Sequence, residues 1–235
     1  IISMLFAGMA LGQLISGPLS DAIGRKKILF ICMGFYLVGS IICYSSKTLE
    51  LMLIGRFVQG LGASGPYVCT MSIVRDKYSG AGMARVMSLV MMIFIMVPAI
   101  APSIGQAILF VGSWRYIFIL YVFYALSVLA WVSIRLEETL PRDKRVPYKL
   151  ANLYHGAKTV LKTKTTVCYT VGMGLMFSCM MGYLNSRQLI FYQLFNTGEM
   201  FVVYFGCLAL TFGVSSMLNS SFVMKYGMRY ISQRA

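Results

Sequence analysis

The sequence predicts an all-α protein that crosses a membrane several times. Of its 235 residues, 58% are hydrophobic and only 12% are charged, and the mean hydropathy is +0.75. An ordinary soluble domain is roughly 45–50% apolar. Several stretches reach about 20 residues, which is enough to cross a hydrocarbon layer of roughly 30 Å. Each is expected to be a helix, because unpaired backbone groups are too costly in lipid.

Seven such windows can be drawn along the chain. They are expected at 1–19, 28–45, 49–71, 86–110, 115–134, 166–190 and 201–223. The Gly60-Leu61-Gly62 run inside the third window predicts either close packing against a neighbouring helix or a kink in the helix. The chain begins with Ile rather than Met and has no charged signal-peptide region, so it is expected to be part of a longer protein.

The long polar stretch after the fifth window indicates two bundles. Residues 1–134 are expected to form an N-terminal bundle, 135–165 a cytoplasmic linker and 166–235 the start of a C-terminal bundle. The pattern of 13–28 also recurs, in weaker form, at 216–231. Such a recurrence is expected where one half of a transporter repeats the topology of the other.

The distribution of cations predicts the orientation. Seventeen Lys and Arg residues fall on one side of the windows, and only Lys47, Arg115 and Arg187 fall on the other. Since cytoplasmic loops carry the excess of Lys and Arg, the cation-rich side is expected to be the cytoplasm. The net charge of +14 is spread over short clusters between apolar spans, which argues against nucleic-acid binding.

A polar turn between the first two windows carries most of the functional information. It reads G-P-L-S-D-A-I-G-R-K-K at 17–27. Gly17 and Gly24 are expected to permit positive φ and close helix approach. Asp21 can accept hydrogen bonds from the amides of a helix N-terminus, which we expect the partner bundle to present. The cations that anchor this loop are Arg25, Lys26 and Lys27.

A second acidic residue is expected to join this turn. Asp76 follows the third window on the same side of the membrane as Arg25, so the topology predicts an ion pair between the two side chains. The alternative is a solvated loop charge, for which an ion pair is worth only about 0–1 kcal/mol.

Arg56 is the one cation placed inside an apolar window. A charge at mid-membrane costs roughly 2.5–3.5 kcal/mol on insertion scales and usually marks a functional site that faces a polar cavity and pairs with a carboxylate. Gln59 and Tyr67 follow at spacings that place them on or beside the same helix face. The alternative is that Arg56, near the start of its window, extends to the outer membrane surface.

Three motifs resemble those of the major facilitator superfamily. The 17–27 turn resembles its G-x-L-x-D-x-x-G-R-K-K signature, and R-x-x-Q-G-x-G at 56–62 resembles the fourth-helix motif linked to proton coupling. The run 97–105 resembles the fifth-helix motif of the antiporters, G-x-x-x-G-P-x-x-G-G, although Val97, Ala101 and Gln106 replace three of its glycines. The residues that we assign to this motif are Pro98, Ala101, Pro102 and Gly105. The resemblance implies a major facilitator fold in which this chain supplies helices 2–8 of twelve.

Five runs point to one branch of this superfamily: V-R-D at 74–76, A-R-V-M-S-L at 84–89, the proline run 98–102, S-W-R at 113–115 and E-T-L-P at 138–141. Through them the chain resembles the Bcr/CflA-type multidrug exporters, most strongly over 12–141. This resemblance implies a multi-pass protein of the bacterial inner membrane, without cofactor or enzymatic activity, that exports hydrophobic drugs or small metabolites in exchange for protons. It also implies that Asp21 and Asp76 belong to a gate between the bundles and that the protein works as a monomer. The acidic residue that the first helix of such exporters contributes to the pocket is absent from this sequence.

Three other functions are compatible with parts of the sequence. A facilitator-fold importer would share the fold and differ in the direction of transport. A seven-helix receptor would match the number of windows, but the recurrence of 13–28 at 216–231 argues against it. A membrane enzyme ranks last, because the sequence has no metal-ligand cluster, catalytic triad or phosphate loop.

Overall fold

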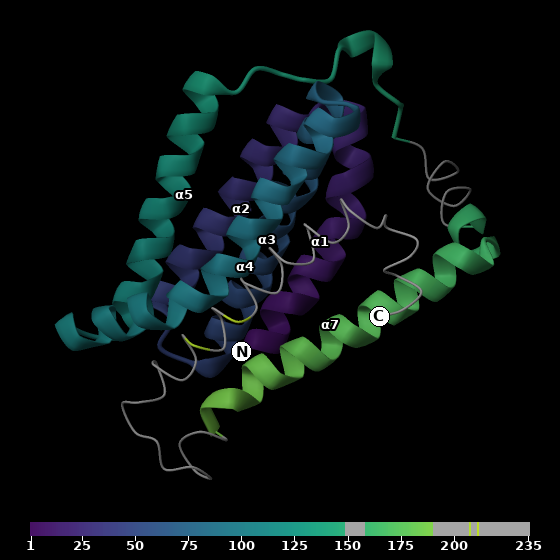
Figure 1. The fold of residues 1–235 in the computed structure, drawn as a ribbon. Coiled ribbons are helices and arrows are strands. Elements are labelled where there is room, and N and C mark those ends of the chain that lie inside the picture. The colour runs from purple at the N-terminus through teal and green to yellow at the C-terminus, as the bar shows by residue number, and fades with distance from the viewer. Residues whose placement is uncertain (149–157, 190–206, 208–210, 212–235) are drawn as a thin grey trace. The chain divides into compact units, whose positions relative to one another are not determined.

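The computed structural model describes residues 1–148 and 158–189, together with residues 207 and 211. Within these residues the long elements are all helices (Figure 1). They are α1 (Ile2–Ile23), α2 (Arg25–Ser45), α3 (Leu49–Lys77), α4 (Gly80–Val111), α5 (Arg115–Arg135), the short η1 (Arg142–Lys144) and α7 (Lys164–Leu189). The first six predicted windows each coincide with one of the long helices. The seventh, 201–223, lies outside the described residues apart from 207 and 211.

Four of these helices are both long enough and apolar enough to cross a membrane, as judged on the described residues. They are α1, α2, α5 and the Lys164–Tyr183 part of α7. Helix α3, which contains Arg56 and several glycines, is not among these four. In α4, the described residues contain the shorter apolar stretch Arg85–Phe94.

The contacts divide the chain into two units, each considered by itself. Unit 1 consists of Ile1–Met87 and Ala107–Tyr154, and unit 2 of Ser88–Gln106 and His155–Ala235. Unit 1 therefore holds α1, α2, α3, α5 and both ends of α4, whereas the middle of α4 and α7 belong to unit 2. The domain boundaries expected from the sequence remain a prediction.

Helix α3 lies at the centre of unit 1, packed against α1 and α2. It begins at Thr48, whose side chain accepts a hydrogen bond from the Leu51 amide at 3.3 Å and so caps the helix. A Cβ added at Gly60 would collide with the backbone of α1 at Leu5, and one at Gly62 with the backbone of α2 at Tyr36. The close packing predicted for the 60–62 run is confirmed, because glycines let both neighbouring helices approach the α3 backbone.

Two small apolar clusters complete unit 1. One forms where α2 meets α3 and α5, and it contains Ile28, Leu29, Cys32, Met33, Cys69, Ala125 and Val132. The other lies at the opposite end of α2 and contains Cys43, Met52 and Phe118. These clusters hold α5 on the side of α2 and so place the segment that follows α5 beside the turn between α1 and α2.

Replacing Gly62 with Ala is expected to lower thermal stability. The added Cβ would meet backbone atoms of Cys32 and Tyr36, which can yield only if α2 moves away from α3. Overpacking of this kind typically costs about 1–3 kcal/mol. The measurement is the thermal unfolding midpoint of the full-length protein in detergent.

The matched control is Gly34→Ala in α2, where an added Cβ meets no atom within 4 Å. This variant is expected to be as stable as the parent or slightly more stable, because Ala favours a helix over Gly by about 1 kcal/mol. Equal stability of Gly62→Ala and the parent would contradict the close approach of α2 and α3.

Candidate functional site

A single glycine joins α1 to α2. Gly24 has φ 111° and ψ 152°, a conformation that L side chains rarely adopt, and its amide donates to the Ser20 carbonyl at 3.2 Å. A Cβ at this position would also collide with the carboxylate of Glu138. The expectation for Gly24 is thus confirmed. For Gly17 it is wrong: this residue lies within α1, and its added Cβ would reach only Val68 Cγ1, at 3.9 Å.

The turn places Arg25 at the centre of a charged cluster. Its side chain is 9% exposed and forms ion pairs with Asp21 Oδ1 at 2.5 Å and with Asp76 Oδ2 at 3.3 Å. Its Nη1 also donates to Ser20 Oγ at 2.6 Å. We call Ser20, Asp21, Arg25 and Asp76 the Arg25 cluster. The predicted pair between Arg25 and Asp76 is present, so one cation links the ends of α1, α2 and α3.

The burial of the Arg25 side chain determines how much it depends on its acidic partners. A buried guanidinium loses its hydration, and removing one of its counter-charges leaves a desolvated charge without compensation. Asp76 is 23% exposed in its side chain, whereas Asp21 is 50% exposed. Asp76 therefore holds Arg25 in a less hydrated setting, and Asp21 keeps half of its surface available to other groups.

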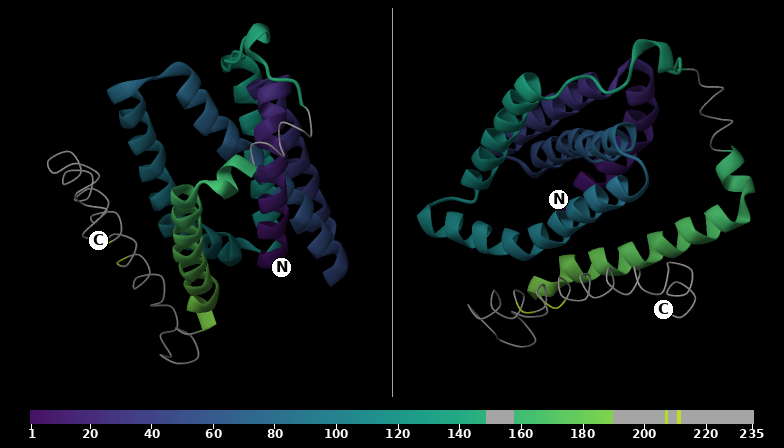
Figure 2. Two further views of the ribbon diagram at one scale, coloured as in Figure 1. Left: turned by 90° about the vertical axis from the view of Figure 1, so that its right-hand side faces the viewer. Right: turned by 45° about the horizontal axis from the view of Figure 1, so that its top comes forward.

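The segment that follows α5 crosses over this cluster. We call residues 136–146 the strap; Figures 1 and 2 show it running from the end of α5 towards the turn between α1 and α2. Glu138 Oε1 accepts a hydrogen bond from the Arg25 amide at 2.9 Å, and Thr139 Oγ1 donates to Asp76 Oδ2 at 3.3 Å. Further along, the Val146 amide donates to the Asp21 carbonyl at 3.2 Å. The strap therefore contacts the Arg25 cluster through both side chains and backbone.

Glu138 belongs to the E-T-L-P run at 138–141, but its contact with the start of α2 was not predicted from the sequence. It supplies the cap that α2 lacks, because Gly24 has no side chain to accept a hydrogen bond from the first helical amides. The signal in the sequence was indirect: α2 begins with three cations and no acidic residue in its first turn. Cations at this position are repelled by the positive end of the helix dipole. A carboxylate from another part of the chain would reduce this repulsion. Lys26, expected to anchor the loop, donates to the Ser133 carbonyl at 3.2 Å.

Arg56 lies within unit 1, directed towards α2 and α5. Its Nη1 donates to Gln59 Oε1 at 3.2 Å, and Gln59 Nε2 donates to Ser40 Oγ at 2.9 Å. The guanidinium carbon lies 4.7 Å from the centroid of the Phe118 ring, a cation–π contact. Gln59 and Ser40 are fully buried. These contacts hold Arg56 inside the packed helices and disfavour the alternative in which it extends to the membrane surface.

The carboxylate expected beside Arg56 is not found in the described part of the chain. No Asp or Glu described in the structure lies within ion-pair distance of its guanidinium, and its Nε is buried without a hydrogen-bond partner. Tyr67, predicted to border the same face, lies further along α3 with 36% of its surface exposed. Arg56 is thus a cation with one hydrogen-bond donor, Nε, that has no partner among the described residues.

The antiporter-type motif lies within α4. The helix continues through Pro98 and Pro102. Ala101 is exposed, and an added Cβ at Gly105 would meet no atom within 4 Å. Contacts between this motif and a partner bundle remain a prediction.

Comparison with known proteins identifies the family of this helical chain. The chain belongs to the Major Facilitator Superfamily, whose sequence profile matches residues 1–232. This confirms the predicted family and fold, and it excludes the seven-helix receptor.

Three curated relatives match almost all of the chain. An uncharacterized MFS-type transporter, YdgK of Bacillus subtilis, is 29% identical over 226 residues, which are 95% of this chain and 55% of the relative. A bicyclomycin resistance protein homolog of Haemophilus influenzae is 27% identical, with 94% and 56% covered. The multidrug resistance protein MdtL of Escherichia coli is 29% identical, with 93% and 54% covered. The chain thus spans about half the length of the relatives that it matches.

A solved structure shares the fold. The crystal structure of the human organic anion transporter MFSD10 (TETRAN) matches with a TM-score of 0.69 at 18% identity, over 91% of this chain and 55% of that one.

Replacing Glu138 with Ala is expected to release the strap. The change removes the acceptor for the Arg25 amide and the ion pair with Arg145, so the strap should open and trypsin should cleave after Arg142 several-fold faster. The measurement is the rate of limited proteolysis of the full-length protein, with fragments identified by mass spectrometry. Glu137→Ala is the matched control, because Glu137 is exposed and has no ion-pair partner in the described residues. Equal cleavage rates in the two variants would contradict the role of Glu138.

Proposed function

We propose that the full-length protein is a Bcr/CflA-type secondary transporter of the bacterial inner membrane. It exports hydrophobic drugs or small metabolites in exchange for protons, by alternating access and as a monomer. The printed names of two relatives, a bicyclomycin resistance protein homolog and a multidrug resistance protein, support export of antibiotics. In two-bundle transporters, substrate sites lie near the bilayer midplane, where rocking of the bundles exposes them to either side.

The Arg25 cluster is the observation that carries this proposal. Alternating access needs a latch at each end of the cavity that holds one state and releases in the other. Arg25 joins three helix ends and the strap through charges, and Asp21 keeps half of its side chain exposed. In the proposed cycle, Asp21 accepts hydrogen bonds from a helix N-terminus of the partner bundle when the cytoplasmic side closes. Such contacts are worth about 0.3–2 kcal/mol.

Arg56 is assigned the coupling role. Its charge is held inside the helices by Gln59 and Phe118, and its Nε is left without a partner among the described residues. A cation in this setting senses the protonation of any nearby carboxylate strongly, because the low local dielectric leaves their interaction poorly screened. In the proposed cycle, a carboxylate supplied by another helix of the full-length protein exchanges the proton.

The first test is Arg56→Ala in the full-length protein. Proton-driven export is expected to fall at least about tenfold while the amount of protein in the membrane stays the same, because the charge that senses the proton is removed. The assay is transport of a lipophilic cationic dye and of a neutral antibiotic in proteoliposomes with an imposed pH gradient. Arg75→Ala is the matched control, an exposed cation in the last turn of the same helix.

Two outcomes of this assay would count against the proposal. Retained proton-coupled export by Arg56→Ala would remove the coupling role of that residue. Inward movement of substrate by the parent protein would instead support the facilitator-fold importer.

The second test is Asp21→Asn. This change removes the charge that pairs with Arg25 while preserving the shape of the side chain, so turnover is expected to fall by about fivefold or more with little change in dye affinity. Affinity and efflux are measured on the same full-length variant. Asp143→Asn provides a matched loss of charge at an exposed site in η1. A collapse in affinity with normal turnover of bound substrate would identify Asp21 as a substrate ligand instead of a latch.

A further inference from the structure

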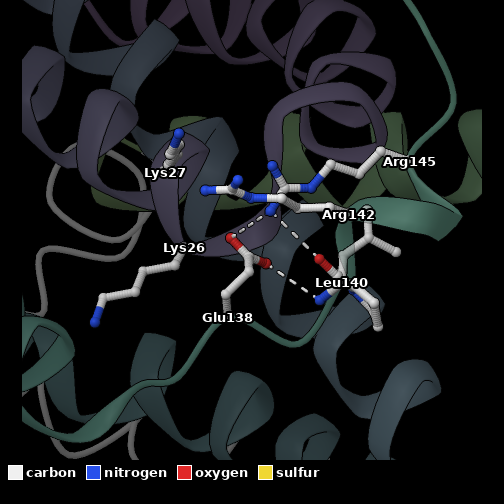
Figure 3. A pocket seen from close by; sticks show the side chains of 7 residues that line it. Lys26, Lys27, Glu138, Leu140, Arg142 and Arg145 are labelled. Atoms are coloured by element: carbon white, nitrogen blue, oxygen red, sulfur yellow. Dashed lines mark hydrogen bonds and ion pairs between the residues drawn. The ribbon is translucent and has the colours of Figure 1, made fainter.

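A pocket of about 380 Å³ lies between the first turn of α2 and the strap, next to the Arg25 cluster. It is lined by Lys26, Lys27, Glu138, Leu140, Pro141, Arg142 and Arg145. Figure 3 shows these side chains, which come from the first turn of α2 and from the strap. All of them belong to unit 1.

The lining is strongly cationic. Four of the seven residues carry a positive charge, and Glu138 is the one carboxylate among them. Glu138 is already engaged, because it accepts from the Arg25 and Leu140 amides at 2.9 and 3.2 Å and lies 3.9 Å from Arg145 Nη2. Its charge therefore offsets only part of the positive charge around it.

Two exposed cations of the pocket have no anionic partner in the part of the chain that the structure describes. Lys27 and Arg142 are exposed, and no carboxylate of the described residues lies within 4 Å of either. Arg145 is 20% exposed in its side chain, and its Nε is buried with no hydrogen-bond partner in the described structure. The pocket thus offers both free charge and an unused, desolvated donor.

The backbone adds to this preference for an anion. Helix α2 begins at the pocket with three consecutive cations and no acidic residue in its first turn. A helix N-terminus carries a partial positive charge, so these cations and the dipole repel one another. An anion placed between the first turn of α2 and the strap would relieve both sources of repulsion.

The position of the pocket indicates which kind of anion could bind there. It lies where α2 begins and where the strap leaves α5, and both are apolar helices long enough to span a membrane. The pocket therefore lies at the depth of the lipid headgroups, on the side that the cation distribution predicts to be cytoplasmic. Basic pockets at helix ends on this side suit the phosphate groups of anionic lipids, and each nearby Lys or Arg strengthens that attraction.

We infer that this pocket binds the phosphate headgroup of an anionic phospholipid and thereby attaches the strap to the membrane surface. Arg142 and Lys27 supply the exposed charges, and Arg145 supplies the inner donor. Glu138 holds Arg145 in place and excludes a second anion. The inference does not depend on the transported substrate or on proton coupling.

The experiment compares two double variants of the full-length protein. Lys27→Gln with Arg142→Gln removes two exposed charges from the pocket. Lys77→Gln with Arg135→Gln removes two exposed charges from the ends of α3 and α5, outside the pocket. Both are measured by native mass spectrometry and by titration with phosphatidylglycerol, with phosphatidylcholine as the neutral lipid.

We expect the parent protein to retain phosphatidylglycerol in preference to phosphatidylcholine. The pocket variant should lose about tenfold in affinity for phosphatidylglycerol, and the control variant less than about twofold. Equal losses in the two variants would overturn the inference, because they would reflect net charge alone. The absence of any preference for the anionic lipid would overturn it as well.

A competition arm separates a lipid from a soluble phosphate. Millimolar glycerol 1-phosphate and inorganic phosphate are added to the lipid-bound parent protein. Retention of the lipid supports the headgroup assignment, since the acyl chains contribute to binding. Displacement by either soluble anion would overturn that assignment and identify a site for free phosphate compounds.

Discussion

The burial of the Arg25 guanidinium is the constraint on which the rest of unit 1 depends. A cation that is 9% exposed needs counter-charges close by, and these come from Asp21 at the end of α1 and Asp76 near the end of α3. Asp21 lies four positions before Arg25, and the chain turns between them at Gly24 with a φ that other residues rarely adopt. The ends of three helices are therefore fixed relative to one another by a single charge.

In the middle of the bundle, the glycines of α3 allow α1 and α2 to pack closely against it. Because Gly60 and Gly62 bring the backbones of α1 and α2 against α3, polar side chains in the middle of α3 are enclosed by neighbours. Gln59 then donates to Ser40, and Arg56 lies against Gln59 and Phe118. A charge that would be costly in lipid is thus held against polar and aromatic side chains of neighbouring helices.

The strap connects this bundle to the rest of the chain. It contacts the Arg25 cluster through Glu138 and Thr139, and together with the first turn of α2 it forms the cationic pocket. One carboxylate, Glu138, takes part in both, since it caps α2 and pairs with Arg145. Glu138 therefore links the Arg25 cluster to the cationic pocket through direct contacts.

The sequence by itself determined the helical windows, the family and the pairing of Arg25 with Asp76, because apolar runs and short motifs act locally. Tertiary structure decided the role of Glu138, which lies 113 residues from its partner and binds a backbone amide that no motif records. It also decided that Gly17 is an ordinary helical residue, and that Arg56 meets Gln59 and Phe118, with no carboxylate near it in the described residues. These features depend on which helices lie side by side, and hydropathy and residue spacing carry no information about that.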